Sequence, residues 1–242
     1  MTSWLMNKSS AATNRLKRLV PRPVKHAVKE ALLDRKFRRA LQSVGQLSEG
    51  ETPSRELLTE LQIGWGNESF AASYDYLEEV IQRACTTKGP ILECGSGLTT
   101  ILLGVIAGRR GIETWSLEHT PEWHARLEAT LRRHSISSVH LCFAPLREYQ
   151  DFAWYDPPLE TLPHNFSLVV CDGPPGTTPG GRYGLLPLLG NHFAPDVLIL
   201  LDDANRAGEA QTLSRWTTEK NISTEMREAS TGTFALVTYP QS

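Results

Sequence analysis

The clearest chemical pattern in the sequence is a glycine turn that follows a short apolar segment. Residues 90–94 have the composition of a buried strand, and Gly95, Ser96 and Gly97 come directly after them. Glycines at such a turn allow a tight backbone and the close approach of a ligand. Glu118 ends the next apolar segment, where a carboxylate can accept hydrogen bonds from both hydroxyls of a ribose. The spacing therefore predicts a site for a nucleoside-containing cofactor.

Aspartates end two later apolar segments. Asp172 follows residues 166–171, and Asp202 and Asp203 follow residues 197–201. The carboxyl ends of strands in an open α/β sheet form its ligand crevice, so we expect these acids to lie near the glycine turn. They are candidates for a general base, or for ligands of Mg²⁺, Mn²⁺ or Ca²⁺. A structural alternative is that Asp203 caps the following helix and Asp172 orders its loop.

Hydrophobic spacing indicates the elements that position these residues. The expected strands are 90–94, 113–117, 139–143, 166–171, 197–201, 223–229 and 234–239. The expected helices are 24–44, 55–62, 70–86, 98–109, 121–134, 183–192 and 206–219. This alternation predicts a doubly wound, seven-stranded, mostly parallel sheet preceded by a helical arm. Only a short turn joins the last two strands, so they must form an antiparallel C-terminal hairpin.

The segment from Glu93 through Gly95 and Gly97 to Thr99 resembles motif I of class I S-adenosylmethionine-dependent methyltransferases. A dinucleotide-binding fingerprint would place a third glycine where Thr100 stands, which disfavours an oxidoreductase. The resemblance covers about residues 70–242 and implies S-adenosylmethionine as the cofactor. It implies cofactor contacts from Glu93, Gly95, Ser96, Gly97, Thr99, Glu118, His119 and Asp172.

Two narrower resemblances concern the aspartates. Catechol-type O-methyltransferases hold a metal with an Asp at the fourth strand and an Asp-Asn pair at the fifth, where this chain has Asp202-Asp203. Residues 172–175, 181–183 and 202–209 are also similar to the glucuronoxylan O-methyltransferase group, which implies a sugar hydroxyl as the methyl acceptor. The first resemblance implies catalytic or metal-binding roles for Asp172, Asp202 and Asp203.

Four further residues are candidates for substrate binding. Arg182 and Arg206 flank the aspartates and can bind a carboxylate or phosphate of a substrate, or neutralise the acids themselves. Trp154 and Tyr155 lie in the long connection 147–165. Their rings can stack on a substrate, or form the small core of a lid.

The net charge of −2 over 242 residues hides a strong asymmetry. Residues 1–50 hold 11 Lys/Arg and 3 Asp/Glu, a balance of +8, and the remainder has a balance of −10. We expect a basic helical arm and linker at 1–66 and a methyltransferase domain at 67–242. The arm can dock on its own body, remain a solvated helix, or contact a membrane surface or another anionic partner.

The sequence contains no run long and apolar enough for a transmembrane helix and no segment typical of a signal peptide. Its four cysteines form no CxxC pair and suit a reducing compartment. We therefore expect a cytoplasmic protein, and the acidic body argues against a nucleic-acid partner.

Two hypotheses about function follow. The first is an S-adenosylmethionine-dependent O-methyltransferase that acts on a small-molecule or carbohydrate hydroxyl, assisted by Asp172, Asp202 and Asp203. The second is a non-catalytic binding module of the same fold that engages a partner or membrane through its basic arm. The acids at strand ends favour the first hypothesis. Oligomeric state does not follow from the sequence.

Overall fold

The structure, a computed structural model, describes residues 22–66 and 72–239. Its main sheet has seven strands in the order β3-β2-β1-β6-β7-β9-β8. The strands are β1 (Ile91–Cys94), β2 (Thr114–Glu118), β3 (Val139–Phe143), β6 (Phe166–Cys171), β7 (Phe193–Leu201), β8 (Ser223–Glu228) and β9 (Thr233–Tyr239). The first five strands in this order, from β3 through β2, β1 and β6 to β7, run parallel, and β9 is antiparallel to both β7 and β8. The predicted fold class is confirmed, including the antiparallel C-terminal hairpin.

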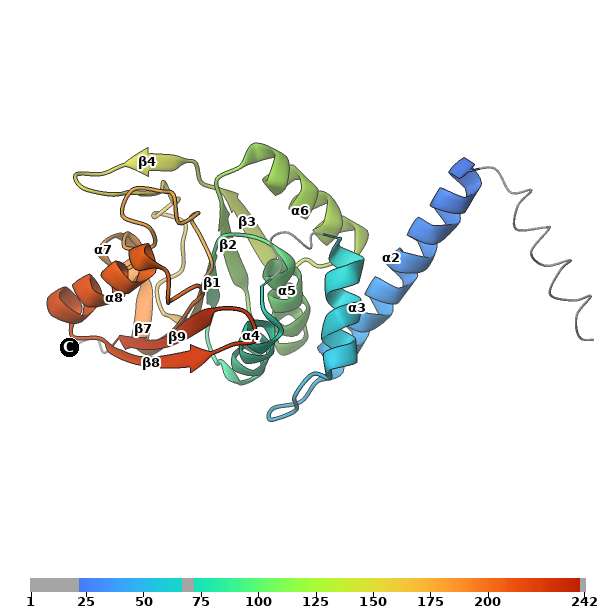
Figure 1. Cartoon of the computed structure of the whole chain (residues 1–242), viewed down its shortest axis with the longest axis horizontal. Helices are drawn as coiled ribbons and strands as arrows, with labels where there is room; N and C mark the ends of the chain where they lie inside the picture. The colour runs from blue at the N-terminus through green and yellow to red at the C-terminus, as the bar shows by residue number, and fades with distance from the viewer. Residues whose placement is uncertain (1–21, 67–71, 240–242) are drawn as a thin grey trace, which may run out of the picture.

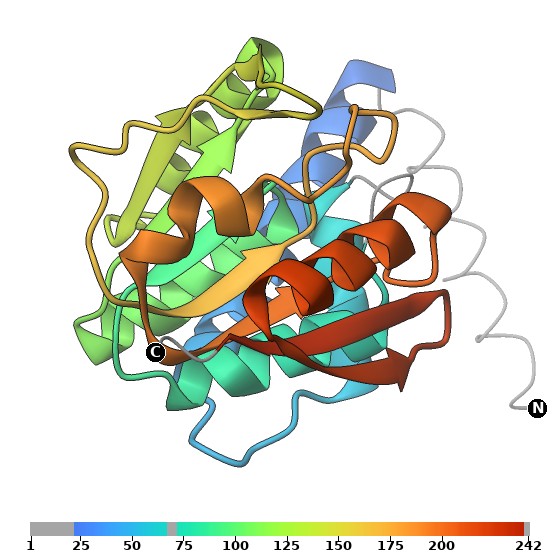
Figure 2. The same ribbon diagram turned by 90° about the vertical axis from the view of Figure 1, so that its left-hand side faces the viewer.

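Helices cover both faces of this sheet (Figures 1 and 2). Side chains of β6 alternate between two cores: Leu168 and Val170 face one, and Val169 and Cys171 face the other. The first core also takes side chains from α2 (Arg22–Gln46), α3 (Arg55–Trp65), α4 (Tyr74–Thr86), α5 (Leu98–Arg110) and α6 (Pro121–Arg133). The second takes them from α7 (Leu185–Leu189) and α8 (Ala207–Lys220), with the 3-10 helix η2 (Gly190–His192) between α7 and β7. Burial on both faces explains why these strands are almost continuously apolar.

The expected connection at 147–165 contains structure that the sequence did not indicate. Strands β4 (Leu146–Glu148) and β5 (Ala153–Tyr155) form a separate antiparallel pair. Three-residue strands are too short to show an alternating pattern, which is why the prediction missed them. Strand β7 begins at Phe193, before its expected start at Val197, because Phe193 already pairs with Phe166 of β6. The register of the two strands then shifts before Leu168 pairs with Leu198.

The apolar side chains of helix α2 do not lie in a single stripe along the helix. Its second half buries Phe37, Leu41 and Val44, whereas Val24, Val28 and Leu32 in its first half are exposed. The step from position 32 to position 37 is five residues, which turns the helix surface by about 140° at 3.6 residues per turn. The apolar residues of α2 therefore form two stripes on different faces of the helix.

The buried half of α2 belongs to the first core together with α3, α4 and α5. Arg109 of α5 also donates to the carbonyl of Gly45, at 2.5 Å. The domain boundary predicted between residues 66 and 67 remains a proposal. In the structure, α3 and α4 lie on the two sides of this boundary and pack in the same core. Among the described helices, none is both long and apolar enough to cross a bilayer.

Candidate active site

The glycine turn after β1 is pressed against the turn after β6. Gly95 has a φ of +94°, and a Cβ at this position would lie 2.7 Å from the backbone nitrogen of Gly173. A Cβ on Gly173 would lie 2.8 Å from Gly95 Cα. Strands β1 and β6 are in register up to Cys94 and Cys171, so both turns leave the sheet at the same level. Only glycine fits at Gly95, because the backbone of Gly173 fills the space that a side chain would need.

Glu93 lies directly beneath this turn and is fully buried. Its Oε2 accepts hydrogen bonds from Thr100 at 2.6 Å and from Ser116 at 2.5 Å, and Thr100 Oγ1 accepts one from the Gly97 backbone at 2.8 Å. Burial raises the pKa of Glu93 to about 7, although the hydroxyls of Ser116, Thr100 and Thr99 oppose this shift. Its Oε1 is buried and has no hydrogen-bond partner. One buried acceptor atom therefore remains without a partner at the base of the glycine turn.

Glu118 stands at the end of β2, beside the same turn. Its Oε2 accepts a hydrogen bond from Ser96 at 2.5 Å, and its Oε1 accepts one from the Thr120 backbone at 2.7 Å. The Nδ1 atom of His119 lies 3.3 Å from Glu118 Oε1. The indole of Trp123 donates to the Ser96 carbonyl at 2.7 Å and so fixes the turn from the side of α6. A carboxylate offers about four lone-pair sites, so Glu118 keeps acceptor capacity for a pair of hydroxyls.

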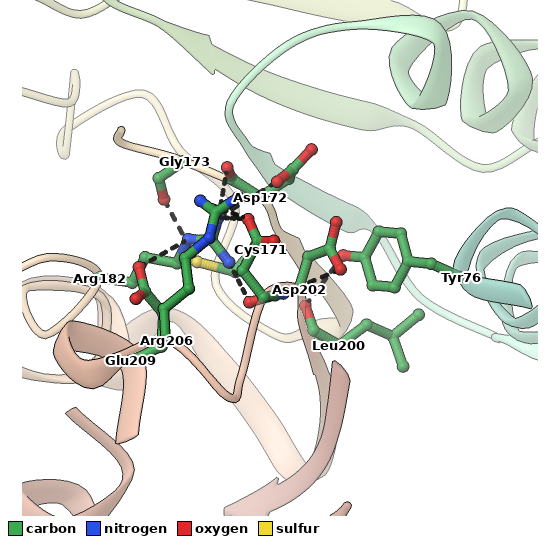
Figure 3. Close-up of polar contacts among 10 residues, drawn as sticks. Tyr76, Cys171, Asp172, Gly173, Arg182, Leu200, Asp202, Arg206 and Glu209 are labelled. Atoms are coloured by element: carbon green, nitrogen blue, oxygen red, sulfur yellow. Dashed lines mark hydrogen bonds and ion pairs between the residues drawn. The ribbon is translucent and has the colours of Figure 1, made fainter. Parts of the chain in front are cut away.

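The three aspartates meet at the ends of β6 and β7, as the strand-end argument predicted. One carboxylate oxygen from each of Asp172, Asp202 and Asp203 lies within 4.8 Å of the others. The guanidinium of Arg182, only 1% exposed, lies among them. Figure 3 shows it beside Asp172 and Asp202. Its Nη2 donates to Asp172 Oδ1 at 3.1 Å and to Asp203 Oδ2 at 3.2 Å, and its Nη1 donates to the Asp202 carbonyl.

The network around Arg182 extends further on both sides. Buried Glu209 of α8 places its Oε1 3.8 Å from Arg182 Nε, and Arg206 pairs with Asp203 at 2.8 Å. The side chain of Arg206 is 56% exposed. The N-cap of α8 is Arg206, so Asp203 does not cap this helix and the structural alternative for Asp203 is wrong. Of the two arginines, Arg182 neutralises the acids and Arg206 keeps its guanidinium open to solvent.

Burial and mutual repulsion leave two of the aspartates only weakly acidic. Burial raises the pKa of Asp172 to about 6, with Arg182 opposing the shift and Asp203 adding to it. Burial together with the charges of Asp172 and Asp203 raises the pKa of Asp202 to about 7. Among the described residues, Asp202 forms no ion pair, and its Oδ1 accepts only the Asp203 backbone N–H, at 2.9 Å. Asp202 is therefore the carboxylate of the three with the fewest partners.

The expected divalent cation fits this cluster poorly. Three carboxylates are a donor set for a hard cation. However, Arg182 Nη2 already lies between Asp172 and Asp203 and carries a permanent charge. The carboxylates, Asp172 first, hold the pKa of Arg182 above its ordinary value although burial opposes this. A metal ion that shared these oxygens would stand beside a buried like charge, so we assign no catalytic step to a metal.

The structure buries Trp154 and Tyr155 fully, within the second core. Their rings pack edge to face with centroids 5.2 Å apart, as part of this large core and not as a separate small core of a lid. Substrate stacking would require the β4–β5 pair to move away and stays a prediction. The Tyr155 hydroxyl is buried without a hydrogen-bond partner, next to the position that a Cβ on Gly173 would take.

Sequence reasoning gave no role in the site to Ser116, Thr100, Trp123 and Glu209, although Glu209 ends the similar segment 202–209. A signal for Ser116 was available, because Glu93 and Ser116 occupy the same level of neighbouring parallel strands. Thr100 was noted only as a missing glycine, although one turn of helix places its hydroxyl at the start of α5. The contact of Glu209 with Arg182 joins distant segments, and the sequence pattern carried no signal for it.

Comparison with known proteins identifies the fold. No family model and no curated protein sequence matches this chain. Among solved structures, an SAH-bound methyltransferase from Podospora anserina is 13% identical with a TM-score of 0.56, over 84% of this chain and 94% of its own. An O-methyltransferase from Bacillus cereus in complex with SAH is 13% identical with a TM-score of 0.51, over 77% and 92%. A SAM-dependent methyltransferase from Aquifex aeolicus is 10% identical with a TM-score of 0.52, over 76% and 98%. The chain has the class I methyltransferase fold.

Proposed function

We propose that this protein transfers a methyl group from S-adenosylmethionine to a hydroxyl of a small molecule or carbohydrate. The observation that carries the proposal is the glycine turn at Gly95, closed against Gly173, between open acceptors on Glu93 and Glu118. A weakly acidic aspartate cluster lies at the ends of the adjacent strands β6 and β7. Cofactor and acceptor sites thus share one edge of the sheet.

The residues present fit S-adenosylmethionine. Glu118 would accept hydrogen bonds from the ribose hydroxyls, while Ser96 and Thr120 hold its carboxylate in place. The unpartnered Oε1 of Glu93 would accept from the cofactor's ammonium group, which would also favour the ionised form of this buried acid. Backbone at Gly95 and Gly97 would lie against the methionine part, because no side chain intervenes there.

The bound cofactor would supply an electrophilic methyl carbon on a sulfonium. The acceptor oxygen would form a bond to that carbon while the carbon–sulfur bond breaks, and the hydroxyl proton would pass to Asp202. A base with a pKa near 7 is suited to this step at neutral pH. Asp172 and Asp203 are held by ion pairs with Arg182. They would position the methyl acceptor and Asp202 relative to each other.

Exposed Arg206 supports an acceptor that carries an anionic group. Its guanidinium pairs with Asp203 on one side and faces solvent on the other, so it can bind a carboxylate or phosphate of the acceptor. Arg182 cannot do this, because three carboxylates and two backbone carbonyls already surround it. The interpretation of Arg206 as a substrate residue and of Arg182 as a structural residue refines the expectation from sequence.

Calorimetric titration with S-adenosylhomocysteine tests the cofactor part of the proposal. We expect binding by the whole chain and roughly a 10- to 100-fold loss in Glu118→Ala, since hydrogen bonds to a charged group are removed. Glu122→Ala is the matched control, because Glu122 lies four residues further along the chain, in the first turn of α6, and is exposed. Absence of binding by the folded chain, or equal loss in both variants, would contradict the proposal.

A further inference from the structure

The first turns of α2 extend away from the body of the molecule (Figure 1). Three apolar side chains, at positions 24, 28 and 32, form a line along this segment. Val24 is 47% exposed, Val28 is 53% exposed and Leu32 is 56% exposed. These side chains are one helical turn apart from each other, so they form one continuous apolar strip, which we call the outer strip.

The outer strip faces away from the protein. Residues 37, 40, 41 and 44 of the same helix are buried against the body. At about 100° of rotation per residue, the centre of the outer strip lies roughly 170° from the centre of that buried face. The buried half of α2 fixes the orientation of the helix, so the outer strip faces away from the body of the protein.

Cations lie on the same outward half of the helix. The side chains of Lys29, Arg35, Lys36 and Arg39 are exposed. None of them takes part in an ion pair among the described residues, and their helical angles fall within about 100° of the centre of the outer strip. The acids of this helix lie on the other half: Asp34 pairs with Arg38 and lies 3.8 Å from Arg133 of α6.

We propose that the outer face of α2 binds the protein to an anionic lipid surface. The apolar strip would enter the interfacial region, and Lys29, Arg35, Lys36 and Arg39 would contact headgroup phosphates. The negative balance of residues 51–242 would hold the rest of the molecule away from the surface and so fix its orientation. Residues 1–21 add four Lys/Arg and no Asp/Glu to the same end of the chain.

The combination of side chains favours a lipid surface over other occupants. A second copy docking its own α2 on this strip would bring four like charges against four, which is unfavourable. Nucleic acid would use the cations but would leave Val24, Val28 and Leu32 exposed to water. An anionic bilayer interface satisfies both the apolar strip and the cations.

Co-sedimentation of the full chain with large unilamellar vesicles tests this proposal. We expect binding to vesicles of phosphatidylglycerol and phosphatidylcholine, weak binding to pure phosphatidylcholine, and release by added salt. The double variant Lys29→Glu/Lys36→Glu should lose roughly 25-fold or more in partitioning, at about fivefold for each cation removed. Val28→Ser/Leu32→Ser should also reduce binding, because it removes the apolar contact without changing the charge.

Lys88→Glu/Lys220→Glu is the matched control, since it makes the same change in net charge at two exposed positions of the body. Vesicle binding that survives in this control and is lost in both α2 variants supports the proposal. Equal loss in the control, or no binding of the unaltered chain to anionic vesicles, overturns it. A dimer in solution that dissociates in Val28→Ser/Leu32→Ser would also overturn it, by assigning the strip to a second copy.

Discussion

The two halves of the candidate active site satisfy their acids in different ways. On the cofactor side, neutral donors surround Glu93 and Glu118: hydroxyls of Ser96, Thr100 and Ser116 and a backbone N–H. On the acceptor side, Arg182 joins three aspartates and Glu209 into a charged network. The difference teaches that, in the half proposed to bind the cofactor, oxygen atoms of the acids can still accept hydrogen bonds from a ligand. In the acceptor half, an internal cation holds several acids close together.

The largest effect is expected from replacing the proposed general base in the half that binds the methyl acceptor. Asp202→Asn should lower methyl transfer about 10²- to 10⁴-fold, because the amide cannot take the acceptor's proton. Affinity for S-adenosylhomocysteine should change by less than about twofold, which separates this half from the cofactor half. The measurement is the initial rate of labelled-methyl transfer together with calorimetry on the same variant.

Asp196→Asn is the control for this substitution, since Asp196 is exposed and has a positive φ of 60° that Asn also tolerates. In the unaltered protein the rate should rise about tenfold per pH unit below a pH near 7, where Asp202 loses its proton, and then level off. A rate that is insensitive to Asp202→Asn would move the base to another residue.

Removing the internal cation should cost stability. Arg182→Met should lower the free energy of unfolding by about 3–5 kcal/mol, because buried Glu209 and half-buried Asp172 would lose their cationic partner, whereas Asp203 keeps Arg206. Arg206→Met, at an exposed position, should cost less than about 1 kcal/mol. Urea unfolding followed by circular dichroism compares the two, and similar losses in both variants would contradict the structural role given to Arg182.

Glu93→Gln should separate stability from cofactor binding. The folded state raises the pKa of Glu93 to about 7 from an ordinary 4.5, so the folded protein holds this proton more tightly than the unfolded chain. Its contribution to stability is therefore present below pH 4.5 and is lost as the pH rises through about 7. At pH 8 the neutral amide should raise the free energy of unfolding by about 1–3 kcal/mol.

The same variant should bind S-adenosylhomocysteine more weakly, because an amide is a poorer acceptor for an ammonium group than a carboxylate. Unfolding curves at pH 5 and pH 8, with calorimetry at pH 8, give both quantities. A variant that is less stable than the unaltered protein at both pH values would show that Glu93 is charged and well compensated.

The smallest effect is expected from chelation. Because Arg182 supplies the positive charge between Asp172 and Asp203, treatment with EDTA should change the rate of methyl transfer by less than about twofold. Adding Mg²⁺ afterwards should have equally little effect. Loss of activity that Mg²⁺ restores would show that the cluster works as a metal centre.

The contrast between the two halves also explains what the sequence predicted. Glu93, Gly95 and Glu118 follow from strand ends that are near each other in the chain, so hydrophobic spacing and glycines were enough to bring them together. The strand-end argument also placed Asp172, Asp202 and Asp203 in one cluster.

What the sequence did not predict depends on loops and on three-dimensional contact. Residues 180 and 181 both have positive φ, and the turn they form returns Arg182 to the acids. No periodic pattern in the sequence indicates this path of the chain. The burial of Trp154 and Tyr155 depends on the β4–β5 pair, whose strands are too short to recognise. In α2, the apolar spacing was visible, but its direction on the helix became clear only when the buried half was located.

The most direct test of the central claim is mass spectrometric detection of a transferred methyl group. The purified chain would be incubated in EDTA with isotopically labelled S-adenosylmethionine and a panel of hydroxyl acceptors, including uronic acids and phosphorylated sugars. The account predicts a product that carries one labelled methyl on oxygen, made by Asp196→Asn and not by Asp202→Asn. Binding of S-adenosylhomocysteine without any transfer, or methylation at nitrogen, carbon or sulfur, would contradict it.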